Sequence, residues 1–147
     1  MTDHRFFDTS ALVKRYAEKR GTETVDRLIE STDTTVYVTS IAVVEMTSAF
    51  RRKYNRGECS EETMVGLLSA FFEDALEEYV VLPADESLFG WSFDLIIEDD
   101  LRTLDSLQLA AALGLAAEVE DLQFVCADRR LVDAARARGL DGIDPSE

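Results

Sequence analysis

The chain is poor in the residues that build zinc sites and disulfide frameworks. Its 147 residues include two cysteines, Cys59 and Cys126, and a single histidine, His4. The cysteines lie far apart in different contexts, so we expect no disulfide between them. One histidine cannot complete a zinc site with them. Because free cysteines fit a reducing compartment, the sequence predicts a cytoplasmic protein.

Long apolar runs are also absent. No stretch approaches the roughly 18 apolar residues that a membrane helix needs. The N-terminal Met-Thr-Asp-His-Arg has no apolar signal region, so nothing in it indicates export. We find no repeat, linker or low-complexity stretch, and the hydrophobic fraction of 46% is ordinary for a globular protein. A single domain over residues 1–147 is therefore expected.

Positive charge is scarce. Thirty acidic residues face 15 basic ones, the formal net charge is −15, and only Lys14, Lys19 and Lys53 are lysines. Proteins that bind nucleic acid usually show a basic footprint, so this balance is unusual for such a role. Two interpretations stay open. The surface is adapted to a salt-rich cytoplasm that screens self-repulsion, or the protein is simply acidic and its few arginines are placed where they matter.

Strand-like and helix-like patterns alternate along the chain. Short apolar or β-branched runs predict strands at residues 5–8, 36–39, 80–82 and 123–127. Helical periodicity and capping signals predict helices at 10–18, 22–31, 40–55, from 60 onward, and at 86–97, 103–117 and 129–138. Ser40 is the predicted N-cap of the third of these. This alternation predicts an α/β fold, with a parallel sheet of about four to five strands and helices on both faces.

Four isolated carboxylates stand at comparable points of this pattern. Asp8 and Asp128 each end an apolar run and precede a helix, whereas Glu45 and Asp105 lie early in helices. The carboxyl ends of parallel strands share one edge of the sheet, where ligands bind, so these four acids can meet there. A cluster of like charges is costly unless a cation neutralises it, which predicts a metal site. Ligands that are all oxygen favour Mg²⁺ or Mn²⁺ over zinc or copper.

Two of the acids have a structural explanation in helix capping. Aspartate caps helix N-termini well, so Asp8 and Asp128 are each suited to cap the helix that follows. Thr9 and Ser10 are also suited to cap the first helix, which would leave Asp8 free to face the edge of the sheet.

The other two acids have their own structural explanations. A carboxylate in a first helical turn, as at Asp105, gains from the helix dipole without any function. Glu45 lies on the same helix face as Ile41 and Ala42, which we expect to point inward. Because an unpaired buried glutamate is rarely tolerated, the alternative is a buried ion pair with Arg52 or another arginine.

The segments around these acids resemble a known family. Phe-Asp-Thr-Ser-Ala-Leu-Val-Lys, a mid-chain Ser-x-x-x-x-Glu, Leu-Asp-Ser-Leu-Gln-Leu-Ala-Ala-Ala and Ala-Asp-Arg-Arg-Leu occur in that order. In order and spacing they resemble the four acidic motifs of the PIN-domain ribonucleases, most closely the VapC-like toxins of type II toxin–antitoxin pairs. The resemblance covers nearly the whole chain. Cys126 departs from it, because that family often has threonine or serine there.

The resemblance implies a PIN-like fold and an endoribonuclease that depends on Mg²⁺ or Mn²⁺. It assigns catalysis to Asp8, Glu45, Asp105 and Asp128. Asp8 and Asp105 are the best candidates for direct metal ligands, and Asp128 binds the metal directly or through water. Glu45 either binds metal or acts as general base. The implied partners are an RNA substrate, a VapB-like antitoxin whose tail blocks the acids by inserting arginine, and a second copy of the chain.

Substrate contacts are also predicted from hydroxyl and basic residues. The candidates that could hold RNA phosphates are Thr9, Ser10, Arg51, Arg52, Arg129 and Arg130. Donation to Asp8 and plain helix capping are the alternatives for the two hydroxyls. The alternative for Arg51 and Arg52, which cluster with Lys53 and Arg56, is a solvated helix C-terminus that favours cations.

Two rival functions remain on sequence grounds. One is a PIN scaffold that binds RNA or protein without turnover, against which the presence of all four acids argues. The other is a phosphatase that uses Asp8 as nucleophile; such enzymes usually carry a second aspartate two residues on, where this chain has Ser10. The large aromatic residues read as core or interface rather than as platforms for bases.

Overall fold

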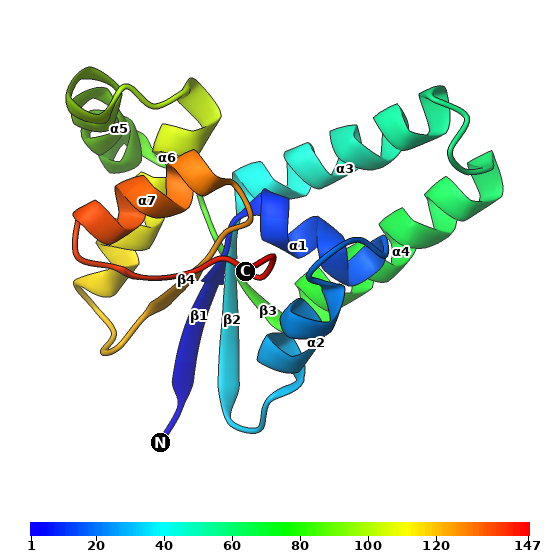
Figure 1. Ribbon diagram of the computed structural model, residues 1–147, viewed down its shortest axis with the longest axis horizontal. Helices are drawn as coiled ribbons and strands as arrows, with labels where there is room; N and C mark the ends of the chain where they lie inside the picture. Colours follow the sequence, from blue (N-terminus) through cyan, green and yellow to red (C-terminus); the bar gives the residue numbers. More distant parts are fainter.

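A five-stranded parallel sheet forms the centre of the molecule in the computed structural model, which describes residues 1–147 (Figure 1). The strands are β1 (Asp3–Phe7), β2 (Thr34–Thr39), β3 (Tyr79–Leu82), β4 (Gln123–Val125) and β5 (Asp141–Ile143). Their order across the sheet is β3-β2-β1-β4-β5, and every neighbouring pair is parallel. All five carboxyl ends therefore lie along one edge of the sheet.

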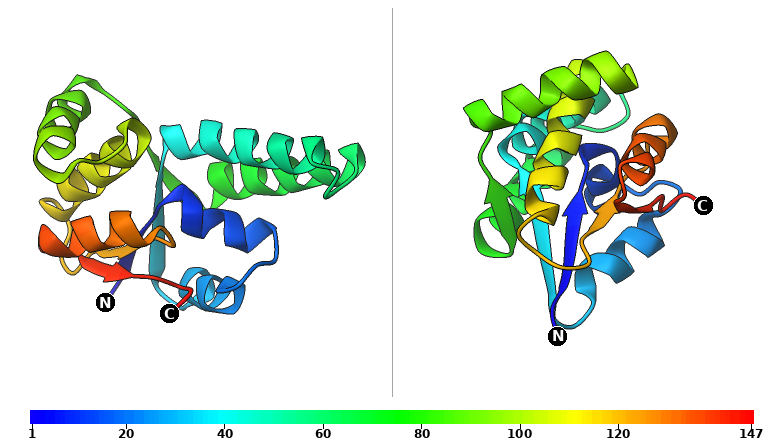
Figure 2. Two further views of the ribbon diagram at one scale, coloured as in Figure 1. Left: turned by 45° about the horizontal axis from the view of Figure 1, so that its top comes forward. Right: turned by 90° about the vertical axis from the view of Figure 1, so that its left-hand side faces the viewer.

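Helices cover both faces of this sheet (Figure 2). One face carries α1 (Thr9–Tyr16), α2 (Thr22–Glu30), α3 (Ser40–Asn55) and α4 (Glu61–Glu77), and the other carries α5 (Glu86–Asp99), α6 (Thr103–Ala116) and α7 (Arg129–Ala137). The strands supply both cores because successive side chains point to opposite faces. Phe7 and Val125 belong to the core under α1–α4, whereas their neighbours Phe6 and Phe124 belong to the other.

Helices α3 and α4 pair and extend away from the body of the molecule (Figures 1 and 2). Gly57 ends α3 with a left-handed conformation, φ 75°. The Gly57 N–H donates to the Tyr54 carbonyl at 2.9 Å, and the Glu58 N–H donates to the Lys53 carbonyl at 3.1 Å. This pair of bonds is a Schellman motif, which satisfies the last carbonyls of the helix. It also fixes the backbone of Glu58 directly beyond the end of α3.

The predicted α/β architecture, with a parallel sheet and helices on both faces, is confirmed. Two details differ from the sequence prediction. Strand β5 was missed because its three residues, Asp-Gly-Ile, are too short to show a pattern. Ser40 does not cap α3; Thr39 does, since its hydroxyl accepts from the Ala42 N–H at 3.0 Å. The Ser40 hydroxyl instead accepts from the Ala84 N–H, which ties α3 to the chain beyond β3.

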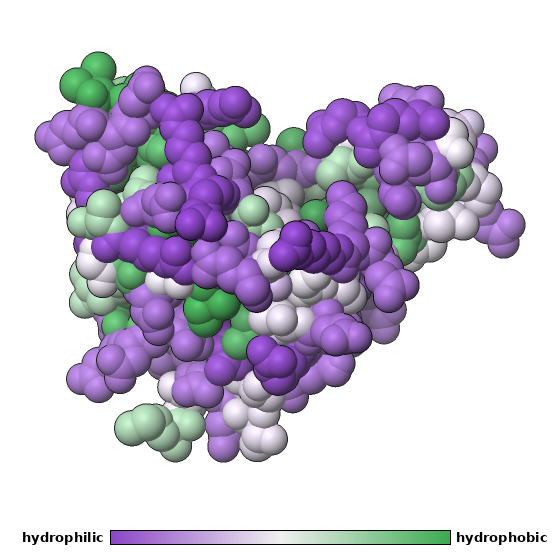
Figure 3. All heavy atoms as spheres, viewed as in Figure 1, coloured by the Kyte–Doolittle hydropathy of each residue, from purple (hydrophilic) through white to green (hydrophobic).

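Other predictions from composition can be compared with the structure. Cys59 and Cys126 are both free. None of the seven helices has both the length and the apolar character needed to cross a bilayer. Hydrophilic residues cover most of the face seen in Figure 3, and apolar atoms gather on it over α5, at the upper left. On that helix Phe89, Phe93 and Ile97 are 45%, 66% and 83% exposed.

Candidate active site

The four predicted acids all come from segments that begin at the carboxyl edge of the sheet. Asp8 directly follows β1, and Asp128 lies between β4 and α7. Glu45 lies in the second turn of α3, which starts where β2 ends, and Asp105 lies in the first turn of α6. Glu45 and Asp105 both raise the pKa of Asp8. Asp128 and Glu45 raise that of Asp105. The four carboxylates therefore form one electrostatic cluster.

Asp8 is nearly inaccessible and caps α1. The residue is 4% exposed. Its Oδ2 accepts from the Ser10 N–H at 3.1 Å and from the Ser10 hydroxyl at 2.6 Å. The expectation that Thr9 or Ser10 would cap this helix is therefore wrong. Asp8 has the extended backbone of an N-cap, whereas Thr9 and Ser10 are already helical.

Burial raises the pKa of the Asp8 carboxyl to about 6. The hydrogen bonds from Ser10 oppose this shift, and the charges of Glu45 and Asp105 add to it. Near neutral pH, Asp8 thus carries its negative charge at a cost to the fold unless a cation compensates it.

Ser10 joins the ends of two neighbouring strands. Its hydroxyl donates to Asp8 after β1 and accepts from the Ala127 N–H after β4 at 3.0 Å. The Cys126 Sγ lies 3.7 Å from both the Asp8 Oδ2 and the Ser10 Oγ. Burial, followed by the charge of Asp8, raises the pKa of this thiol, so it stays protonated. Cys126 therefore packs against the acids as a neutral group with weak hydrogen-bonding capacity.

Glu45 is held by neutral donors rather than by an arginine. Its Oε1 accepts from the Thr9 hydroxyl at 2.9 Å and from the Gln108 Nε2 at 3.0 Å. Gln108 Nε2 also donates to the Thr9 Oγ1 at 3.1 Å, and its Oε1 accepts from the Thr39 hydroxyl at 3.0 Å. The network thus connects the ends of β1 and β2 to α3 and α6.

This network corrects the ion-pair interpretation of Glu45. Arg52 lies two turns along α3 and donates to the Ser48 hydroxyl at 2.6 Å instead. Gln108, which is 1% exposed, is the residue that sequence reasoning missed. The available signal was one amide in the apolar run of α6, placed one turn after Asp105. Its two donors and its acceptor are all used, so a buried glutamine is tolerated there.

Asp128 and Asp105 complete the cluster. Asp128 caps α7, because its Oδ1 accepts from the Leu131 N–H at 3.1 Å, so its structural explanation is also correct. Burial is the largest cause that raises the pKa of Asp105, followed by the charges of Asp128 and Glu45. The guanidinium groups of Arg102 and Arg130 act in the opposite direction.

The oxygen ligands of the cluster fit a hard divalent cation, although the side chains do not have the geometry of a complete metal site. Asp8 Oδ1, Glu45 Oε2 and Asp128 Oδ2 accept no hydrogen bond, and neither oxygen of Asp105 does. Every acid therefore keeps an oxygen available as a ligand. No group of three histidine, cysteine, aspartate or glutamate side chains has the arrangement that holds a metal ion.

The arginines predicted to bind phosphate make other contacts in the structure. Arg130 pairs with Asp100 at 2.9 Å, and Arg129 pairs with Asp133 and Glu147 at 3.6 and 3.2 Å. The Arg51 guanidinium lies over the ring of Tyr54, 5.2 Å from its centroid. Their contact with phosphate stays a prediction.

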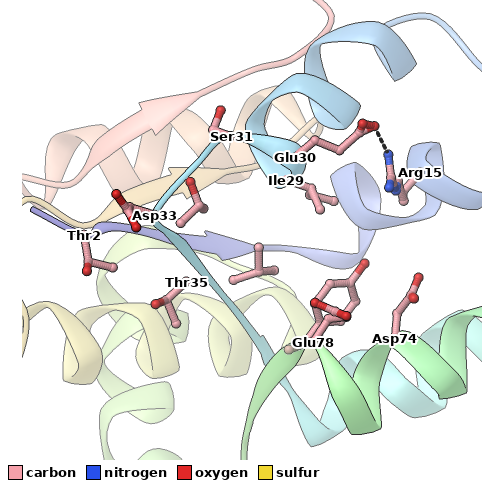
Figure 4. Close-up of a pocket in the computed structure, with 12 residues that line it drawn as sticks. Thr2, Arg15, Ile29, Glu30, Ser31, Asp33, Thr35, Asp74 and Glu78 are labelled. Atoms are coloured by element: carbon pink, nitrogen blue, oxygen red, sulfur yellow. Dashed lines mark hydrogen bonds and ion pairs between the residues drawn. The ribbon is translucent and has the colours of Figure 1, made fainter.

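The largest cavity does not lie at the acids. A hollow of about 700 Å³ opens at the beginning of β2, with Thr35, Asp33 and the ion pair of Arg15 and Glu30 along its wall (Figure 4). A smaller cleft of about 290 Å³ between α1 and α3 is lined by Thr9 and Ser10, which hydrogen-bond to Glu45 and Asp8. Thr9 and Ser10 thus connect this second space to the acids.

Comparison with solved structures finds the same fold in a toxin, in a toxin–antitoxin complex and in a VapBC structure. VapC20 from Mycobacterium tuberculosis, a sarcin-ricin loop cleaving toxin, has a TM-score of 0.67 and 16% identity over 95% of this chain and 97% of that one. A toxin–antitoxin complex from Klebsiella pneumoniae has a TM-score of 0.66 and 15% identity, over 97% of this chain and 98% of that one. VapBC2 from Rickettsia felis, bound to a DNA fragment from its promoter, has a TM-score of 0.64 and 14% identity, over 95% of this chain and 97% of that one.

The chain has a PIN-like fold. The five-stranded parallel sheet and its two helical layers match these structures along nearly the full length of each chain. The sequence itself matches no family model and no curated protein. At 14–16% identity the shared property is the PIN-like fold, and the chemistry of the site must be argued from its own residues.

The raised pKa of Asp8 predicts a pH-dependent gain in stability for Asp8→Asn without metal. The folded state binds the Asp8 proton up to pH about 6, whereas the unfolded chain releases it near 3.8. Stability from this group is thus present below pH 3.8 and lost as pH rises through 6. In urea unfolding with EDTA, the free energy of unfolding of the variant should rise relative to that of wild type between pH 4 and 7, by on the order of 2–3 kcal/mol. A stability difference that does not change with pH would contradict this account of Asp8.

Gln108→Leu should weaken metal binding more than it weakens the fold. The change keeps the volume but removes both donors that orient Glu45 and Thr9. Loss of such supporting bonds typically reduces metal affinity or activity by about 10–100-fold. The matched control is Gln123→Leu, which removes an amide that accepts from Arg5 at 2.7 Å away from the acids. Mn²⁺ affinity, measured by calorimetry, should fall in the first variant alone; an equal fall in both would make Gln108 merely structural.

Proposed function

We propose that the chain is a Mg²⁺- or Mn²⁺-dependent endoribonuclease, the toxin half of a VapBC-like pair. The observation that carries the proposal is the cluster of Asp8, Glu45, Asp105 and Asp128, each with an oxygen free, at the carboxyl edge of a PIN-like fold. Solved structures with this fold include a toxin–antitoxin complex and VapBC2, and one, VapC20, is described as a toxin that cleaves the sarcin-ricin loop. The proposed substrate is RNA.

The roles of the acids follow from their free oxygens. Asp8 and Asp105 would hold the cation directly, and Asp128 would hold it directly or through water. Bound there, the ion supplies a water of lowered pKa and neutralises charge on the phosphate. Asp8 presents Oδ1 to the site while Ser10 holds Oδ2, so the carboxylate keeps one orientation. That fixed orientation is what a ligand needs in order to position its metal.

Glu45 is assigned the proton transfer, and its negative charge also helps the three aspartates to hold the cation. Thr9 and Gln108 both donate to its Oε1, which fixes the side chain and leaves Oε2 as the acceptor. A base held in this way can accept a proton from the attacking water without first reorganising. The hydroxyl of Thr9 is occupied by Glu45, so its proposed role is to position that base rather than to bind phosphate.

The proposed partner is a VapB-like antitoxin in the same cytoplasm. The free oxygens of the four acids offer good acceptors for the paired N–H groups of an arginine. A tail that inserts an arginine would neutralise the cluster in the way that a cation does, and it would block the site at the same time. The structures that share the fold include toxin–antitoxin complexes, which supports this partner.

A rival function uses the same fold to bind RNA or protein without turnover. The free oxygens of the acids favour the enzyme, because a binding module has no need of four mutually repelling carboxylates near a buried edge. The next experiment separates the two functions.

Asp105→Asn should abolish metal-dependent RNA cleavage and leave the fold intact. The change keeps the size of the side chain and removes the charge that holds the cation, and no hydrogen bond to Asp105 is lost. The assay is cleavage of a mixed RNA pool with Mg²⁺ or Mn²⁺, with EDTA as the blank and Asp133→Asn on α7 as the control. Turnover within about tenfold of wild type, a barrier change under about 1.4 kcal/mol, would exclude Asp105 from catalysis.

Two copies of the chain should associate through α5. Phe89, Phe93 and Ile97 recur every fourth residue, so they form one apolar stripe on this helix, and all three are exposed. Such contiguous apolar surfaces mark interaction sites. Sedimentation should show a dimer for wild type and a monomer for the double variant F93S/I97S. The control is Leu76→Ser, which removes an equally exposed apolar residue on α4. A monomeric wild type would contradict the proposal.

A further inference from the structure

The cleft between α1 and α3 is basic although the chain as a whole is acidic. Lys19, Arg52, Lys53 and Arg56 line it, and Glu58 is the one acidic residue among its lining. The chain has a formal net charge of −15 and only 15 basic residues. The cleft, of about 290 Å³, has four basic residues for one acidic residue, whereas the whole chain has 15 basic residues for 30 acidic ones. Such a field favours an anionic occupant.

The cleft leads directly to the acids. Thr9 and Ser10 form part of its wall, and their hydroxyls donate to Glu45 and Asp8. Figure 1 shows α1 beneath α3, with both helices beginning near the carboxyl edge of the sheet. An extended anionic chain that lies in the cleft would therefore reach the carboxylate cluster at its end.

The basic residues of the cleft differ from those beside Asp128 in whether a carboxylate neutralises them. Arg129 and Arg130, beside Asp128, are held in ion pairs with carboxylates. Arg52 donates to a serine hydroxyl and forms no ion pair, and Lys19 forms none either. Two of the four basic side chains of the cleft, Arg52 and Lys19, thus have no carboxylate partner and can bind an anionic ligand.

Glu58 is the exception within the cleft, and the backbone fixes its position. The Schellman motif at Gly57 places Glu58 directly beyond α3, and its carboxylate turns back to pair with Arg56 and, at 3.9 Å, with Lys53. The hydrogen bond from Arg56 is the main cause that lowers the pKa of Glu58, and the charge of Lys19 contributes as well. One carboxylate therefore occupies the point where the basic side chains converge.

We propose that this cleft holds the phosphates of single-stranded RNA on one side of the bond that is cut, and that Glu58 occupies one phosphate position until RNA displaces it. The inference rests on the proposed nuclease function for the identity of the polymer. A phosphodiester and the Glu58 carboxylate each carry one negative charge, so RNA binding exchanges one anion for another at Lys53 and Arg56. Glu58 thereby lowers the affinity for any polyanion that cannot compete with it.

Recognition in the cleft is expected to be independent of base sequence. Its apolar lining consists of Val13, Ala17, Ala49 and Phe50, and Phe50 is 1% exposed, so no aromatic face is open for a base to stack on. Basic side chains that contact phosphates position the strand without reading its bases. An acidic peptide has the same charge, but continuity with a cluster suited to phosphodiester hydrolysis favours RNA.

The test is the binding of a fluorescein-labelled eight-nucleotide single-stranded RNA in EDTA, which stops cleavage. Affinity is measured by anisotropy across a salt series. Glu58→Gln should bind about tenfold more tightly than wild type at low salt. Lys53→Gln and Arg56→Gln should each bind more weakly and should each reduce the slope of log affinity against log salt by about 0.7. All three side chains are 26–56% exposed, so folding should persist, and melting temperatures check this.

Arg27→Gln is the matched control, because it removes one positive charge from an exposed residue of α2 that does not line the cleft. The proposal is overturned if Glu58→Gln binds no more tightly than wild type, or if the two cleft variants match Arg27→Gln. It is also overturned if an oligoglutamate of equal charge displaces the RNA at the same concentration, which would make an acidic peptide the occupant. If the binding differences are found but wild type does not cleave RNA with Mg²⁺ or Mn²⁺, the nuclease function is refuted and the phosphate-binding cleft is retained.

Discussion

Repulsion between four carboxylates at one edge of the sheet is the constraint on which the site depends. The charges of Glu45 and Asp105 raise the pKa of Asp8, and those of Asp128 and Glu45 raise the pKa of Asp105; burial is the largest cause at both, and at Asp8 it raises the pKa to about 6. The parallel topology favours this arrangement, since the chain leaves every strand at the same edge of the sheet. The fold therefore carries a destabilising group that only a cation, a proton or an arginine can relieve.

The surrounding structure holds the acids in place with neutral hydrogen bonds rather than with ion pairs. Ser10 donates to Asp8, and Thr9 and Gln108 donate to Glu45. A neutral donor fixes one carboxylate oxygen and leaves the net charge of the cluster unchanged. An arginine in the same place would have neutralised the cluster permanently and competed with a metal. The basic residues that line the α1–α3 cleft likewise form no ion pair with any of the four acids.

Much of the fold and the gathering of the four acids at one edge of the sheet could be predicted from sequence, because both follow local patterns. Apolar runs ending in a single acid predicted β1 and β4, and the alternation of strands and helices predicted the parallel sheet. The contacts between distant segments could not be predicted in this way. Whether Asp8 or Ser10 caps α1 depends on a backbone angle at the end of β1, which composition does not encode.

Gln108 and Glu58 illustrate the same limit. The amide of Gln108 has a role only because α6 packs beside the ends of β1 and β2, and the carboxylate of Glu58 has one only because Gly57 turns the chain back over α3. The ion-pair alternative for Glu45 is wrong for this reason, since its partners Thr9 and Gln108 lie 36 and 63 residues away in the sequence.

The central claim is that the carboxylate cluster is a site for a divalent cation. The most direct measurement is the melting temperature of the wild-type protein as Mn²⁺ is raised from zero to about 10 mM at constant ionic strength and pH 7. A ligand that binds only the folded state stabilises it in proportion to the logarithm of its concentration above the dissociation constant. The account predicts a melting temperature that rises steadily with Mn²⁺ and returns to its starting value with EDTA. A melting temperature that stays flat across the whole series would contradict it.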